Sequence, residues 1–268
     1  MSEPIISLKH IVKRYGKHQV LNDVSMDINE GDIYGLIGRN GSGKTTIFKI
    51  ILGLSDYQSG EIHIGGSGDT VDVGREKIGF FVGQNMFPHM TAKENLQYYR
   101  ILKNIKDTNE IDRVLKLVGL DDVKSRVSQY SLGMRQRLGI ANALLGNPRL
   151  IILDEPANGL DPQGIADIRN LVKELNRENG TTFIISSHIL GELQNTAEKF
   201  GILNGGVIVK ELTEDDLSVS NNTIRISVDD ADKARTLLTD AGIRILDESS
   251  DKISLEDYYF SLVGGEER

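Results

Sequence analysis

Eight consecutive residues, Gly38-Arg39-Asn40-Gly41-Ser42-Gly43-Lys44-Thr45, match the phosphate-binding pattern G-x-x-x-x-G-K-[ST] in full. The glycines let backbone N–H groups curl around a phosphate, and the start of the following helix adds a partial positive charge. Lys44 is expected to reach the β- and γ-phosphates, and Thr45 to supply a hydroxyl to Mg²⁺. Thr46, the next residue, is expected to bind the nucleotide. The alternative is a flexible glycine loop, but the position between an apolar run and a helical pattern favours a phosphate site.

Two adjacent carboxylates, Asp154 and Glu155, follow the apolar run Leu150–Leu153. In a parallel sheet such a strand ends at the edge where ligands bind. Asp154 fits the role of holding Mg²⁺ through water, and Glu155 that of a general base for the attacking water. Alone, this pattern is more often a strand that runs into a turn. Together with the phosphate loop it predicts a site for nucleotide hydrolysis.

The elements that must position these residues follow an alternating order. Continuous apolar runs rich in β-branched residues are typical of strands buried on both faces in a parallel sheet, and they occupy Ile33–Ile37, Leu150–Leu153 and Thr182–Ile185. Helical patterns lie between them, at Thr45–Leu52, Asn109–Val118, Arg135–Leu145 and Pro162–Arg177. An antiparallel β portion is expected from Ile5–Val12, Gln19–Ile28 and Gly60–Ile64. The pattern predicts an α/β core with an antiparallel β subdomain.

The net charge of −8 lies in the last part of the chain. Residues 213–268 contain 14 acidic and 6 basic residues, so residues 1–212 are balanced. This distribution argues against nucleic acid as the main partner, because that usually requires a basic face. It also predicts a domain boundary near residue 212 and a small acidic α+β unit after it. The elements expected there are strands at 223–228, 243–246 and 252–255 and helices at 231–239 and 255–263.

The chain has no cysteine, which excludes disulfides and thiolate metal sites. No apolar run reaches the roughly 18 residues that span a bilayer, and the first residues lack a basic region and a signal core. We therefore expect a cytoplasmic protein whose association with a membrane depends on a partner.

Together with further positions, these motifs resemble the ATP-binding cassette family over roughly residues 4–212. In this resemblance Tyr15 matches the aromatic that stacks on adenine, although alone it would be an ordinary strand aromatic. Gln84 matches the loop glutamine that senses Mg²⁺ and faces the membrane subunit. His188 follows the run Thr182–Ile185 and matches the switch histidine that contacts the γ-phosphate.

The family signature, usually written L-S-G-G-Q, reads Y-S-L-G-M at residues 130–134 and departs at three positions. Ser131 is placed to cap the following helix, whose free N–H groups can point at a phosphate. Gly133 still allows close backbone approach, so both are expected to grip the γ-phosphate bound by an opposing subunit. Leu132 in place of a glycine puts the usual backbone path in question. Asp161 matches the loop that crosses the dimer interface.

The run S-L-G-M-R-Q-R-L-G-I-A from Ser131 and the tail Leu255–Phe260 resemble the ATPases of bacterial exporters of the bacitracin-resistance and lantibiotic-immunity type. The tail fits a plain amphipathic helix equally well. The resemblance implies a P-loop NTPase core with a helical signature subdomain at about residues 90–145. It also implies two ATP-binding subunits, identical or different, that enclose ATP and Mg²⁺. They would bind the cytoplasmic face of the cell membrane through a permease contacted around residues 84–94.

Three alternatives remain at this point. A soluble translation-factor ATPase usually has two cassettes and basic linkers, whereas this chain has one cassette and an acidic tail. A non-hydrolytic nucleotide switch is disfavoured by the presence of Glu155 and His188. An importer ATPase requires an extracellular binding protein, which one chain cannot reveal.

Overall fold

The computed structural model of this 268-residue chain describes residues 4–65, 69–83, 86–214, 216 and 231–243. The chain divides into two compact units, Met1–Leu212 and Thr213–Arg268. In the second unit, helix α9 (Ala231–Asp240) confirms the helix expected there. The strands expected at 223–228 and 252–255 and the helix expected at 255–263 lie outside the described residues, as does all but the first residue of 243–246.

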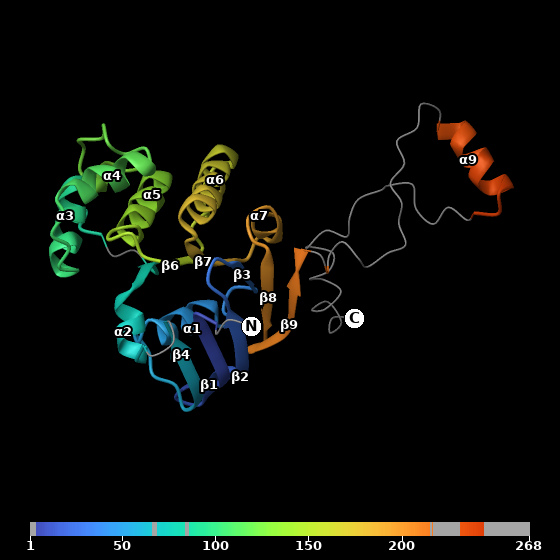
Figure 1. The fold of residues 1–268 in the computed structure, drawn as a ribbon, viewed down its shortest axis with the longest axis horizontal. Helices are drawn as coiled ribbons and strands as arrows, with labels where there is room; N and C mark the ends of the chain where they lie inside the picture. Colours follow the sequence, from blue (N-terminus) through green and yellow to red (C-terminus); the bar gives the residue numbers. More distant parts are fainter. Residues whose placement is uncertain (1–3, 66–68, 84–85, 215, 217–230, 244–268) are drawn as a thin grey trace. The chain divides into compact units, whose positions relative to one another are not determined.

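The larger sheet of the first unit has six strands in the order β5-β6-β7-β3-β8-β9 (Figure 1). The strands are β3 (Ile33–Ile37), β5 (Ile78–Phe81), β6 (Leu150–Asp154), β7 (Thr182–Ser187), β8 (Lys199–Asn204) and β9 (Val207–Thr213). Strands β5, β6, β7, β3 and β8 are parallel. Strands β3 and β7 are buried along their whole length, which confirms the reading of continuous apolar runs as central strands.

The smaller sheet is antiparallel and has the order β2-β1-β4. Its strands are β1 (Ile6–Tyr15), β2 (His18–Ile28) and β4 (Ser59–Ile64). Buried and exposed residues alternate along much of β2, as in a sheet with one face on the core. The antiparallel subdomain expected from the sequence is therefore confirmed, with β1 longer than predicted.

The helices of the first unit are α1 (Lys44–Ile51), α2 (Val71–Glu76), α3 (Ala92–Leu102), α4 (Asn109–Leu117), α5 (Leu132–Ala143), α6 (Pro162–Asn179) and α7 (Leu190–Gln194), with a 3₁₀ turn at Val127–Gln129. Helix α6 begins with Pro162 in its first turn and ends at Gly180 in the left-handed region (φ 64°), as its sequence predicts. Helix α5 begins three residues before the expected Arg135, because Ser131 caps it. Helices α3, α4 and α5 lie together in Figure 1 and form the helical region expected at 90–145.

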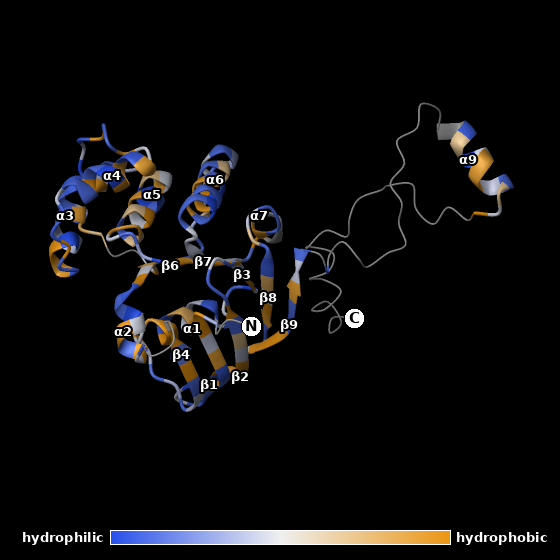
Figure 2. Ribbon diagram, viewed as in Figure 1, coloured by the Kyte–Doolittle hydropathy of each residue, from blue (hydrophilic) through white to orange (hydrophobic). Residues whose placement is uncertain are grey.

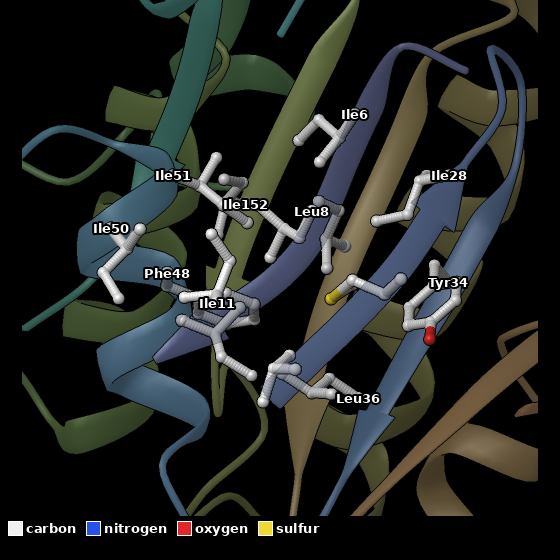
Figure 3. Packing of buried hydrophobic residues seen from close by; sticks show 14 of the residues in the cluster. Ile6, Leu8, Ile11, Ile28, Tyr34, Leu36, Phe48, Ile50, Ile51 and Ile152 are labelled. Carbon is white, nitrogen blue, oxygen red and sulfur yellow. The ribbon is translucent and has the colours of Figure 1, made fainter. Parts of the chain in front are cut away.

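The main core lies where the two sheets meet helix α1 (Figure 3). Ile6, Leu8 and Ile28 from the antiparallel sheet are almost inaccessible to solvent, as are Phe48 of α1 and Ile152 of β6. Burial of such side chains stabilises the fold by about 1.5–3 kcal/mol each. This packing fixes the start of α1 against the ends of β3 and β6, where the chemical motifs lie. In the part of the chain that the structure describes, no helix is long and apolar enough to cross a membrane.

Candidate functional site

The phosphate-binding loop connects the end of β3 to the start of α1, as expected from the sequence. Gly43 has φ 113°, a conformation that residues with a side chain rarely adopt, and a Cβ there would lie 2.6 Å from Leu21. A Cβ on Gly38 would lie 2.5 Å from the Ser42 hydroxyl. Only glycine fits at these two positions. The Ser42 hydroxyl is buried and has no hydrogen-bond partner among the described residues, so the loop contains an unsatisfied polar group.

The side chain of Lys44 is buried in this loop with only 5% of it exposed. Its ammonium donates to the carbonyl oxygens of Gly38 (2.6 Å) and Arg39 (3.3 Å). It also lies 3.2 Å from the Glu155 Oε1 atom. A buried charge must be paired, and here a carboxylate and two carbonyl groups compensate it.

Thr45 and Asp154 meet across the gap between α1 and β6. The Thr45 hydroxyl donates to Asp154 Oδ2 (2.7 Å), while Asp154 Oδ1 accepts from the Ser186 hydroxyl (2.6 Å). Asp154 and Ser186 are register partners on the parallel strands β6 and β7. The parallel register thus places Ser186 beside Asp154 at the carboxyl edge of the sheet. The Thr45 hydroxyl meets the Asp154 carboxylate there, and both groups are hard oxygen ligands.

Glu155 contacts both Lys44 of the phosphate loop and His188, which follows β7. Its backbone lies in the left-handed region (φ 49°), which is strained for a residue with a side chain and is typical of functional sites. The Glu155 N–H donates to the Ser186 hydroxyl (2.9 Å), which holds this backbone in place. The Oε2 atom lies 3.0 Å from His188 Nδ1 and accepts from Asn158 Nδ2 at 3.3 Å.

The signature residues lie at the start of helix α5. Ser131 is its N-cap, and its hydroxyl accepts from the Met134 N–H (3.2 Å), as the sequence predicts. A Cβ on Gly159 would lie 2.4 Å from the Leu132 side chain, and one on Gly133 would lie 3.2 Å from Leu160. Leu132, at a position where the family signature has glycine, therefore packs against the loop that contains Gly159. This contact gives the departure from the signature a structural role.

Two further predicted residues also have local structural partners. Asp161 caps helix α6 by accepting from the Gly164 N–H (3.0 Å). Tyr15 ends strand β1 with 49% of the residue exposed, and the Lys13 ammonium lies 4.7 Å from its ring centre. Hydrogen bonding from Ser55 lowers the pKa of Tyr15, with smaller contributions from Lys13 and from the Thr46 side chain. Tyr15 therefore borders α1, which starts at the phosphate loop.

Through the Ser186 hydroxyl, which contacts both Asp154 and Glu155, the structure joins five of the predicted residues into one contact network: Lys44, Thr45, Asp154, Glu155 and His188. Within the described ranges, no hydrogen bond or ion pair links Ser131, Gly133 or Asp161 to this network. Gln84 lies outside the described residues.

The sequence reasoning missed Ser186 and the contact of Asn158 with Glu155. Ser186 stands at the carboxyl end of a buried strand, a position that could have drawn attention to it. The contact of Asn158 depends on the turn after Glu155, which no sequence pattern reveals.

Comparison with known proteins agrees with this geometry. The family described as ABC transporter matches residues 21–158. The bacitracin transport ATP-binding protein BcrA of Bacillus licheniformis is 36% identical, with 97% of this chain and 98% of the relative covered. The lantibiotic transport ATP-binding protein SrtF of Streptococcus pyogenes is 38% identical over 77% of this chain and 90% of its own.

Solved structures are similar as well. A dimeric, post-hydrolysis ATP-binding cassette bound to ADP and Pi is 30% identical, with a TM-score of 0.69 over 78% of this chain and 98% of its own. An ATP-binding subunit of an ABC transporter is 26% identical, with a TM-score of 0.74 over 97% of this chain and 99% of its own. The chain belongs to the ABC transporter family, as an ATP-binding subunit that hydrolyses ATP.

Proposed function

We propose that this chain is the ATPase of an exporter that protects a bacterium against peptide antibiotics such as bacitracin or lantibiotics. The observation that carries this proposal is similarity along nearly the whole chain, including residues beyond 212, to the bacitracin transport ATPase. A lantibiotic transport ATPase and a linearmycin resistance ATPase of Bacillus subtilis are similar over 77% and 80% of the chain.

The phosphate loop fits the phosphates of ATP. A Lys44 ammonium that contacts carbonyl oxygens can exchange them for β- and γ-phosphate oxygens, which are stronger, charged acceptors. The unsatisfied Ser42 hydroxyl is available to the same phosphates. The residues of the loop, Gly38 to Gly43, surround the phosphates with backbone N–H groups, and Tyr15, beside α1, is placed to stack on adenine.

Thr45 and Asp154 fit Mg²⁺, because their oxygen atoms lie 2.7 Å apart and Mg²⁺ prefers oxygen ligands. Thr45 would hold the ion directly and Asp154 through water, with Gln84 as the proposed third contact. When bound, the ion supplies positive charge that neutralises the phosphate oxygens. Ser186 donates to Asp154 and so orients its carboxylate toward Thr45.

Glu155 is the proposed general base. Its carboxylate accepts the proton of the attacking water, while Lys44 and His188 stabilise the charge on the γ-phosphate. In the structure Glu155 already contacts both of the other side chains and lies between Lys44 and His188. Binding of ATP moves Lys44 from Glu155 to the phosphates and leaves the carboxylate with His188 and Asn158.

Ser131 and Gly133 are proposed to act on the ATP of a second subunit. The first N–H groups of α5 carry a partial positive charge, and the phosphate loop of the same chain already has Lys44 and the start of α1. A second phosphate-binding element is therefore useful to the ATP of another chain. The dimeric cassette bound to ADP and Pi supports this arrangement, with Asp161 in the loop between the two sites.

A groove of about 200 Å³ between β5, α3 and α5 fits the permease partner. Its walls include Phe81, Leu96, Tyr99 and Leu138, and Lys103 lies in it as the charged lining residue. The Lys103 ammonium donates to the Asn142 carbonyl (3.0 Å), and burial lowers its pKa to about 8. Apolar walls of this kind fit an apolar segment of a membrane protein.

The outer face of α3 extends this surface. Tyr98, Ile101 and Leu102 recur at helical spacing and are 46%, 64% and 69% exposed. Part of α3 is orange, the colour of apolar residues, in Figure 2. Such a contiguous apolar stripe on an exposed helix marks an interaction site. It follows residues 84–94, the permease-contact region expected from the sequence.

A substitution in this stripe tests the permease contact. Ile101→Asp should prevent co-purification with the membrane subunit while ATP affinity stays within about twofold of wild type, because the site residues are untouched. Arg149→Asp, at an exposed ion pair outside residues 84–102, is the matched control. Normal complex formation by Ile101→Asp would contradict this contact.

The antibiotic role is tested in a sensitive host. Production of the chain together with its co-purifying membrane subunit should raise the concentration of bacitracin or of a lantibiotic that the host survives. The same pair with Glu155→Gln should give no protection, because export requires hydrolysis. Protection by the inactive pair, or active ATPase complexes without protection against either class, would contradict the proposal.

A further inference from the structure

The turn that carries His188 is fastened by a residue outside the predicted site, Glu192. Ser187 ends strand β7, His188 and Ile189 form the turn, and Glu192 lies in the first turn of α7. The Ser187 hydroxyl accepts from the Ile189 N–H (2.9 Å) and lies 3.0 Å from Glu192 Oε2. One serine hydroxyl thus connects the two sides of the turn.

The proton of this hydroxyl has two possible acceptors, Glu192 Oε2 at 3.0 Å and the Ile189 carbonyl at 3.2 Å. The carboxylate is the shorter contact, and hydrogen bonds to charged acceptors are about twice as strong as neutral ones. The proton therefore points to Glu192. With its proton engaged there, the oxygen of Ser187 keeps its lone pairs toward the Ile189 N–H.

Burial of the Glu192 carboxylate costs free energy, which indicates that its hydrogen bond with Ser187 has a role. Its Oε1 atom is buried and has no hydrogen-bond partner among the described residues. Burial raises the pKa of Glu192, a shift that Ser187 and His188 partly reverse and that Glu155 reinforces. A carboxylate in this position gives up hydration for a single strong hydrogen bond, to Ser187.

Glu192 also borders a cavity of about 30 Å³ immediately behind the catalytic segments. Its lining includes Pro156 and Ala157, which follow Glu155, and Ser186, which holds the Glu155 backbone. Ser187 and Glu192, on the two sides of the turn, also line this cavity, so they are not packed tightly there. The Ser187–Glu192 hydrogen bond supplies the restraint that close packing would otherwise give.

We propose that Glu192 is a positioning residue for hydrolysis: through Ser187 it fixes the turn that presents His188 to Glu155 and to the γ-phosphate. This inference rests on the role of His188 in the proposed function. Glu192 does not touch the nucleotide, so its effect reaches the reaction through the orientation of the imidazole. Small displacements of a catalytic group lower turnover much more than they lower binding.

The test compares ATP turnover and ADP affinity in variants of the full chain. Glu192→Ala should lower kcat by about tenfold, since His188 loses its fixed orientation, while ADP affinity stays within about twofold. Glu192→Gln keeps an acceptor for Ser187 and should remain within about threefold of wild type. Glu198→Ala, an exposed glutamate before β8, is the matched control and should leave kcat unchanged.

Ser187→Ala gives a second route to the same answer. If the two residues act as one unit, Ser187→Ala should match Glu192→Ala, and the double variant should be no slower than either single variant. A double variant whose loss of kcat is the product of the two single losses would overturn the proposal. A kcat for Glu192→Ala within twofold of wild type would also overturn it, as would a Glu192→Gln variant as slow as Glu192→Ala. His188→Ala separates the two levels: normal turnover there contradicts the proposed role of histidine, whereas a slow His188→Ala with a normal Glu192→Ala contradicts only the positioning role.

Discussion

At the scale of single residues, the site depends on how Glu155 is held. Its strained backbone, with φ 49°, is fixed by Ser186, and its carboxylate contacts Lys44, Asn158 and His188. The proposed base is therefore restrained on several sides and would react with little reorganisation. In the proposed mechanism, the ion pair with Lys44 couples nucleotide binding to the environment of the base.

Lys44→Ala tests the phosphate site at this scale. The variant should bind ATP about 10- to 100-fold more weakly, because it loses charge-assisted hydrogen bonds to the phosphates, each of about 1.5–3 kcal/mol. Calorimetric titration with ATP measures the change. Lys49→Ala, an exposed lysine near the end of the same helix, should bind normally. Equal ATP affinity in Lys44→Ala and wild type would show that the loop is not the phosphate site.

At the scale of elements, parallel strands and helix starts place the chemistry. Strands β3, β6 and β7 end side by side and present the phosphate loop, Asp154 and His188 at one edge. Close packing beneath this edge maintains the arrangement. A Cβ on Gly139 of α5 would lie 2.3–2.5 Å from ring atoms of Phe81 on β5, so helix and strand approach more closely than any larger residue permits.

Gly139→Ala should therefore destabilise the protein, by about 1–3 kcal/mol, although alanine is intrinsically the better helix former. Gly191→Ala in α7 is the control, because a Cβ there meets nothing within 4 Å. That variant should be unchanged or gain up to about 1 kcal/mol. Thermal unfolding of both variants and of wild type measures these changes in stability. A Gly139→Ala variant as stable as wild type would contradict the packing argument.

The sequence predicted those elements whose pattern is dominated by burial. Strands β3, β6 and β7 are continuous apolar runs, and α6 carries both of its end signals. Strand β8 was missed because Gly201 interrupts its pattern, and that glycine is required because the Tyr34 hydroxyl would lie 2.2 Å from a Cβ. Helix α3 was expected only as part of the helical region at 90–145, without bounds of its own, because it exposes apolar residues and buries Asn95 and Arg100.

The same division holds for the site. Glu155 and His188 could be predicted because each follows a buried strand, and Lys44 because it belongs to a local motif. Ser186 contacts Asp154 and Glu155 across two strands that only the folded chain brings together. Asn158 and Glu192 contact nearby residues, but through turns whose geometry the sequence pattern does not reveal.

At the scale of the whole molecule, the proposal requires two subunits. Ser131 caps α5 and, together with Gly133, is proposed to contact ATP on the partner. Ser131→Ala costs about 1 kcal/mol of local stability through the lost cap, so a much larger effect on turnover would come from the closed dimer.

A mixed dimer tests action across the interface. When one subunit carries Ser131→Ala and the other Lys44→Ala, one composite site has both defects and the other has none. The mixed dimer should retain one ATP at the intact site, whereas neither pure variant should retain any. Nucleotide retained after gel filtration measures this. A mixed dimer that retains no more ATP than the pure variants would contradict action of the signature in trans.

Hydrolysis by Glu155 is the central claim, and turnover of Glu155→Gln tests it most directly. The amide cannot accept a proton, so kcat should fall by at least about 100-fold while ATP affinity stays close to wild type. Because the variant cannot hydrolyse the ATP that keeps the dimer closed, it should also form a more stable dimer with ATP than wild type does. Normal ATP binding with almost no turnover is the predicted result; turnover near that of wild type would contradict the assignment of Glu155 as the base.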